Sequence, residues 1–112
     1  MKTYNLEDRT FVFARDCRLL VSKLPKTVSN IEDGKQLVRS SGSVGANYIE
    51  ANENLGDKDF KFRIRISRKE AKESLYWLNL LKALNPNSEA IDPLIQEANE
   101  LRKILSAILN KI

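Results

Sequence analysis

Cationic side chains are concentrated between residues 58 and 72 of this sequence. The segment KDFKFRIRISRKEAK alternates strictly between apolar and cationic residues from Phe60 to Ile66, a pattern typical of a half-buried strand. After Ile66 the alternation stops, and residues 67–84 are rich in helix formers and contain no turn signal. The sequence therefore predicts a helix across the whole segment.

Most of these cations share one face of the predicted helix. Rows of Lys and Arg bind phosphate groups by neutralising their charge and releasing counterions. We therefore predict that this face binds RNA or DNA. We call it the cationic stripe, and its members are Lys58, Lys61, Arg65, Arg68, Lys69 and Lys72.

Two other interpretations of the cationic stripe stay open. It could be a solvated surface, or it could be neutralised by the acidic second helical segment of the same or a neighbouring subunit. An alternative function uses the same face: a protein-interaction adaptor that binds an acidic protein partner. Competition by tRNA or heparin separates this adaptor from a nucleic-acid binder.

Residue patterns for catalysis and metal binding are missing from the sequence. There is no His, a single Cys and no carboxylate cluster at metal-ligand spacing, so we predict a protein that is no enzyme and needs no metal or cofactor. Cys17 lies on an apolar helical face and is expected to be a small buried side chain. We expect Glu50 to form an ion pair with an Arg of the third helical segment.

Length and composition predict a single helical domain, residues 1–112. A chain of 112 residues can bury a sufficient core without disulfides or metals, and four Gly with three Pro leave little material for the turns of a β-sandwich or barrel. The lone Cys and the absence of a signal-peptide pattern predict a cytoplasmic location. No apolar run approaches the roughly 20 residues that a bilayer requires, so no membrane contact is predicted.

Capping and stop signals divide the chain into four helical segments. Asn5 can cap the first and Pro25 ends it, while Asp57 and Asp92 can cap the third and fourth. The connections are short, which predicts an all-α, antiparallel up-down four-helix bundle. The expected helices cover about residues 6–24, 30–54, 58–84 and 92–111.

The third segment carries two apolar stripes, one on each side of the cationic stripe. The first suits the core of the subunit and contains Phe60, Ile64, Ala71, Leu75 and Leu78. We predict that the other, called the second apolar stripe, packs against another subunit. Its members are Phe62, Ile66, Trp77, Leu80 and Leu84.

Small residues interrupt the second segment in the run SSGSVGA. Each Gly in a helix interior costs roughly 1 kcal/mol relative to Ala, but the smooth surface lets another helix approach closely. A phosphate-cradling loop is the alternative for GSVG, but it lacks the Lys-Ser/Thr ending and a preceding strand. The residues expected at the close contact are Ser41, Gly42, Gly45 and Ala46.

Two long motifs resemble a known family. QLVRSSGSVGANYIEAN (residues 36–52) and KDFKFRIRISRKEAKESLYWL (residues 58–78) are similar to the 23S rRNA intervening-sequence proteins, and the resemblance covers essentially the whole chain. It implies antiparallel four-helix subunits that assemble into rings, often pentamers. It also implies kinship with the accessory proteins of diversity-generating retroelements, which are basic pentameric barrels that bind nucleic acid and a reverse transcriptase. It implies no established activity.

Overall fold

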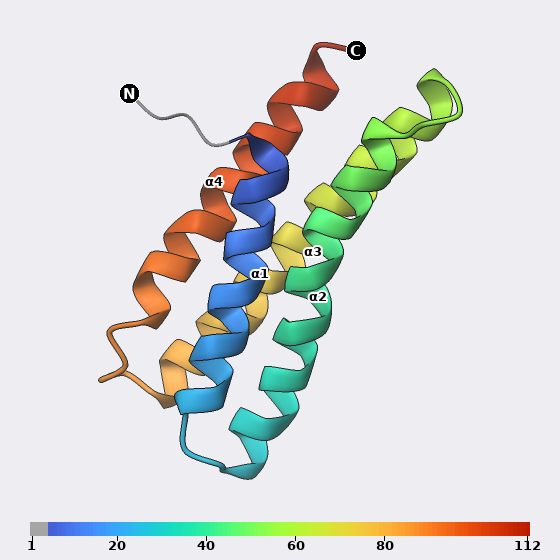
Figure 1. The fold of residues 1–112 in the computed structure, drawn as a ribbon. Helices are drawn as coiled ribbons and strands as arrows, with labels where there is room; N and C mark the ends of the chain where they lie inside the picture. The colour runs from blue at the N-terminus through green and yellow to red at the C-terminus, as the bar shows by residue number, and fades with distance from the viewer. Residues whose placement is uncertain (1–4) are drawn as a thin grey trace.

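The computed structural model describes residues 5–112 and folds them into four α-helices, with no strand in this range. Consecutive helices run in opposite directions (Figure 1). This confirms the prediction of a four-helix all-α fold, including a helix across residues 58–72. Residues 1–4 of the predicted domain lie outside the described part. The helices are α1 (Leu6–Lys23), α2 (Val28–Asn52), α3 (Asp57–Leu84) and α4 (Ile91–Asn110).

Three of the four helices begin one or two residues earlier than predicted, and other residues occupy their N-terminal capping positions. The Thr27 side chain accepts a hydrogen bond from the Asn30 backbone N–H at 3.1 Å, so α2 starts at Val28. Gly56, with a φ of 137°, takes the capping position of α3 that was predicted for Asp57. Asp92 is already inside α4 and accepts a hydrogen bond from Lys82 Nζ at 3.1 Å.

A reciprocal amide pair joins the start of α2 to the end of α3. The Asn30 side-chain nitrogen donates to Asn85 Oδ1 at 3.0 Å and to the Pro25 carbonyl at 2.9 Å. In return the Asn85 amide donates to Asn30 Oδ1 at 2.8 Å. Asn30 is only 5% exposed, so these bonds satisfy an amide that is removed from water and fix this end of the bundle.

The apolar faces predicted from helical spacing meet in one core. The stripe on α1, from Phe13 through Cys17, is buried, and α4 contributes Leu101 and Leu105, which have no exposed surface. On α3 the stripe that contains Ile64 faces this core, as expected. The second apolar stripe lies at the edge of this core. Trp77 packs against the core, whereas the two end members are largely exposed, with exposed fractions of 56% for Phe62 and 61% for Leu84. Ile66 and Leu80 are half-buried.

The small residues of α2 lie against α1. A Cβ added to Gly45 would be 2.8 Å from Thr10 Oγ1, and one added to Gly42 would be 3.0 Å from a guanidinium nitrogen of Arg18. Ser41 is buried and lies beside Cys17 of α1, so Ser41, Gly42 and Gly45 all face α1. The prediction that Ala46 lies at this close contact is wrong. Ala46 is one residue past Gly45 on the helix and is exposed to solvent.

The alternative interpretation of GSVG as a phosphate-cradling loop is also wrong. Residues 42–45 lie in the middle of α2, where their backbone N–H groups belong to the helix. The glycines there serve close approach to α1 and leave no free N–H groups for an anion.

Alanine at Gly45 is expected to lower the free energy of unfolding by about 1 kcal/mol. The helix-propensity gain of roughly 1 kcal/mol is outweighed by overpacking against the buried Thr10, which costs about 1–3 kcal/mol. Gly42→Ala is the matched control, because the flexible end of Arg18 can move aside, and it should raise stability by up to about 1 kcal/mol. Urea denaturation of both variants measures the difference, and equal effects would contradict the close contact at Gly45.

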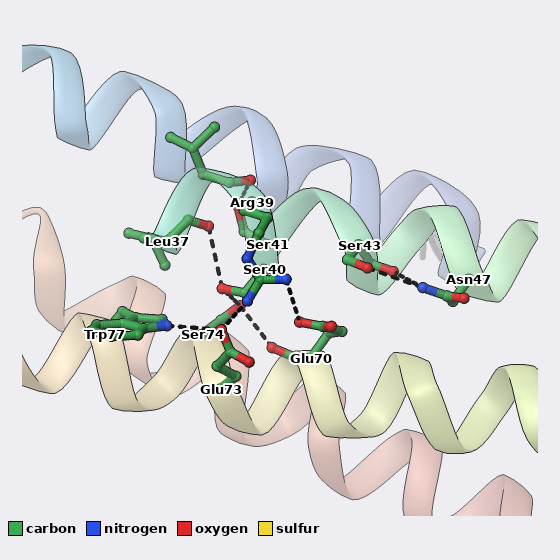
Figure 2. Close-up of polar contacts among 11 residues, drawn as sticks. Leu37, Arg39, Ser40, Ser41, Ser43, Asn47, Glu70, Glu73, Ser74 and Trp77 are labelled. Carbon is green, nitrogen blue, oxygen red and sulfur yellow. Dashed lines mark hydrogen bonds and ion pairs between the residues drawn. The ribbon is translucent and has the colours of Figure 1, made fainter. Parts of the chain in front are cut away.

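Buried hydroxyl groups join α2 to α3 on the other side of α2. Ser40 and Ser74 share a hydrogen bond of 2.8 Å (Figure 2), and both are fully buried. Ser67 donates to the Val44 carbonyl oxygen at 2.7 Å. Small side chains on both helices let them pack closely along their length, and α2 and α3 form the most extensive helix pair in the molecule.

Among residues 5–112, no helix combines enough length with enough apolar character to span a membrane.

Candidate nucleic-acid interface

Four members of the cationic stripe line one pocket between α3 and α4. These are Arg65, Arg68, Lys69 and Lys72, and α4 completes the pocket with Arg102 and Ser106. We call this the basic pocket; its volume is about 360 Å³. Arg68 and Arg102 are half-buried, whereas Lys69 and Lys72 are exposed to solvent. Five cations and one hydroxyl group therefore converge from two facing helices.

The other two members of the cationic stripe lie outside the basic pocket. Lys61 is half-buried and lines a separate hollow with Asp57, Phe60 and Ile112. Lys58 is exposed in the first turn of α3. The stripe is thus divided into a pocket near the middle of α3 and an extension toward the N-terminus of the same helix.

Acidic residues of α4 are paired on the side of α1. The Arg9 guanidinium donates to both carboxylate oxygens of Glu97, at 2.7 and 2.8 Å, and to Glu100 at 2.9 Å. These bonds hold the pKa of Arg9 above its ordinary value, chiefly through the hydrogen bonds to Glu97. Glu97 and Glu100 of α4 are therefore already engaged with α1.

Acidic residues of α3 are paired with α2 (Figure 2). Arg39 of α2 forms ion pairs with Glu70 and Glu73 of α3. The indole N–H of Trp77 donates to Glu73 at 3.0 Å, and this bond, followed by the pairing with Arg39, lowers the pKa of Glu73. Lys69 makes a smaller contribution to the same shift without coming within ion-pair distance.

The predicted ion pair of Glu50 is wrong. Glu50 is exposed near the end of α2 and has no cation within 4.0 Å among residues 5–112. The pairing between these helices has the opposite polarity, because α2 supplies the Arg and α3 supplies the carboxylates. Sequence alone could not settle this, since the rotation of each helix about its axis decides which charges meet.

The basic pocket is consequently not neutralised within the described part of the subunit. None of its five cations forms an ion pair with a carboxylate of residues 5–112, while Arg9, Arg39, Arg63 and Lys82 all do. Like charges that converge without counter-charges create a positive potential that attracts anions. This chain therefore does not neutralise the stripe with its own second helix.

The sequence interpretation missed the contribution of α4. Arg102 lies directly after the core residue Leu101, and Ser106 lies one turn further on, so both flank the buried face. One signal was present: residues 88–100 contain only acidic charges, whereas residues 101–112 contain only cations. This change of sign marks the half of α4 that can extend a basic face.

The described residues offer little other chemistry. Cys17 is fully buried, and burial raises the pKa of its thiol to about 12, so the thiolate is scarce at neutral pH. Residues 5–112 contain no cluster of Cys, Asp and Glu side chains able to hold a metal ion. The basic pocket is therefore the candidate functional site.

Comparisons with known proteins agree with this fold. Residues 2–107 match the family described as 23S rRNA-intervening sequence protein. The chain is also similar to a crystal structure of a protein with unknown function from the S23 ribosomal protein family of Bacteroides thetaiotaomicron, with 30% identity and a TM-score of 0.79. That similarity covers 94% of this chain and 98% of the other. No protein with a curated description matches the chain.

Proposed function

Because the chain belongs to the 23S rRNA-intervening sequence protein family, whose name implies no activity, we propose a function from the basic pocket itself. The protein is a non-enzymatic, homo-oligomeric scaffold that binds RNA or DNA through backbone phosphates. Lys58, Lys61 and the cations of the basic pocket make these contacts.

One observation carries this proposal. Five cations from two helices converge on one pocket, and no carboxylate of the described residues pairs with them. A solvated surface would be expected to mix charges of both signs. Contacts to phosphates alone predict affinity that depends strongly on salt and little on sequence.

Self-association is the second part of the proposal. The second apolar stripe leaves Phe62 and Leu84 largely exposed on α3, the same helix that carries the cationic stripe. Contact between subunits through these residues would cover them and repeat the basic pocket around the assembly. The ring, the pentamer and the kinship with retroelement accessory proteins stay predictions.

The test titrates the protein into a labelled RNA hairpin and into a DNA duplex of similar length at several salt concentrations. The logarithm of the affinity should fall linearly with the logarithm of the salt concentration. In a Lys61/Arg65/Arg68 triple-alanine variant the slope should become less steep by about 1 for each phosphate contact removed.

A second triple variant controls for total charge. Lys23, Lys26 and Lys35 lie around the α1–α2 turn, outside the basic pocket, and their replacement by alanine changes the net charge from +4 to +1, as in the first variant. This control should keep the steep slope. No binding at low salt would sink the proposal. A cellular complex that survives excess tRNA or heparin would instead indicate an acidic protein partner.

A further inference from the structure

We infer that the basic pocket binds a compact oligophosphate, either free in solution or as the 5′-triphosphate end of an RNA. The inference rests on the proposed function for its RNA form, since the same face must hold the rest of the strand. The inference goes further than the proposed function. It assigns the basic pocket to a terminal phosphate group, whereas the proposed function assigns the whole face to backbone phosphates.

Charge density is the first argument. A phosphodiester backbone carries one charge per nucleotide on each strand, at an axial spacing of about 3.4 Å in a duplex. Five cations around a single pocket of about 360 Å³ supply more positive charge than one such phosphate can balance. A terminal phosphomonoester carries about −1.5 to −2 at pH 7, and each further phosphate linked to it adds charge within a few ångströms.

The donors of the pocket suit such a group. Arg68 and Arg102 come from facing helices, and each guanidinium presents a planar fork that matches phosphate oxygens. Ser106 adds a hydroxyl donor from α4. Donors on two sides can surround a compact anion, whereas a strand that passes over a flat row meets cations on one side only.

The division of the cationic stripe indicates the direction in which a bound RNA would run along α3. Lys58 lies seven residues before Arg65, which corresponds to about 10 Å along a helix. That length accommodates roughly two or three further phosphates at backbone spacing. An RNA whose 5′ end occupies the basic pocket can therefore place its next phosphates along Lys61 and Lys58, which lie outside the pocket.

The decisive experiment compares two RNA hairpins of identical sequence, one with a 5′-triphosphate and one with a 5′-hydroxyl group. We expect the triphosphate form to bind about tenfold tighter, because its extra charges meet charge-assisted donors in the pocket. Arg102→Gln should abolish this preference. Lys103→Gln is the matched control, since Lys103 is adjacent and exposed, does not line the pocket, and loses the same charge.

Free tripolyphosphate tests the same pocket without RNA. It should raise the melting temperature of the protein above that in sulfate of equal ionic strength, because a ligand of the folded state stabilises it. Arg102→Gln should lose this shift, and Lys103→Gln should keep it.

The outcomes separate this inference from the proposed function. Equal affinity for both hairpins, with no shift by tripolyphosphate, overturns the inference while salt-dependent RNA binding upholds the function. A tripolyphosphate shift without any RNA binding upholds the pocket with a free oligophosphate as its ligand and removes the proposed function. An end preference that Arg102→Gln leaves intact places the site elsewhere and overturns the inference.

Discussion

A Phe62→Glu/Ile66→Glu double variant is expected to be monomeric, whereas the unaltered protein is expected to assemble. Phe62 is 56% exposed and Ile66 is half-buried, so neither belongs to the core of the subunit. A subunit contact that covers them would have to bury two carboxylates without partners, at a cost of several kcal/mol each. Light scattering after size-exclusion chromatography measures the mass, and far-ultraviolet circular dichroism confirms that the helices persist.

The matched control is a Phe11→Glu/Leu19→Glu double variant. Both residues are exposed on α1, away from the second apolar stripe, and the change in net charge is the same. This variant should keep the mass of the unaltered protein. If both double variants assemble normally, the second apolar stripe is not a subunit contact; if the first variant unfolds, its residues support the fold itself.

Replacing Arg39 with methionine should lower the free energy of unfolding by about 2 kcal/mol at pH 7. Removing one partner of a buried ion pair costs about 3–5 kcal/mol, and the half-exposed Arg39 calls for a smaller value. The variant leaves Glu70, whose side chain is only 13% exposed, beside Glu73 without a cation. Lys35→Met is the control on the same helix: its pair with Glu32 is 3.9 Å long and exposed, so the effect should stay within about 0.5 kcal/mol.

The loss at Arg39 should depend on pH. The pKa of Glu73 lies below its ordinary value of 4.5, first because Trp77 donates to it and then because Arg39 pairs with it. The corresponding stability is fully present above pH 4.5 and disappears as pH falls through the lowered pKa of the folded state. The denaturation curves of the two proteins should therefore converge once the pH falls below the lowered pKa of Glu73. A gap that persists there would assign the effect to packing.

Helix identity and the core could be predicted from sequence because both follow from local periodicity. The spacing of Phe13, Cys17 and Leu20 places them on one face of α1, and all three are buried. The alternation over the seven residues from Phe60 to Ile66 is typical of a strand, but these residues are helical. The helix formers that follow them correctly predicted the helix. Helix starts were less accurate, since side chains such as Asn30 are drawn into tertiary hydrogen bonds instead of capping.

The sequence predicted the part of the candidate site on α3 but not the part on α4. The cationic stripe follows from the 3.6-residue period of one helix, so Arg65 and Arg68 were found. Arg102 was not, because periodicity within α4 cannot say which flank of that helix faces α3. The same limit explains Ala46, which was placed one residue too far around α2, and Glu50, whose expected partner faces elsewhere. The rotation of each helix about its own axis, relative to its neighbours, depends on the packing of the whole core.

The contacts between helices that are neighbours in the sequence have a consequence for folding during synthesis. Each helix packs mainly on its neighbour in the sequence, and among the helix pairs that are in contact α1 and α4 share the smallest contact. Such local contacts have low contact order and form quickly, on a timescale of about microseconds to milliseconds. A growing chain can therefore dock α2 on α1, and then α3 on α2, before α4 has been synthesised. The nascent protein displays the cationic stripe early, but it acquires the basic pocket only when Arg102 and Ser106 arrive with the last helix.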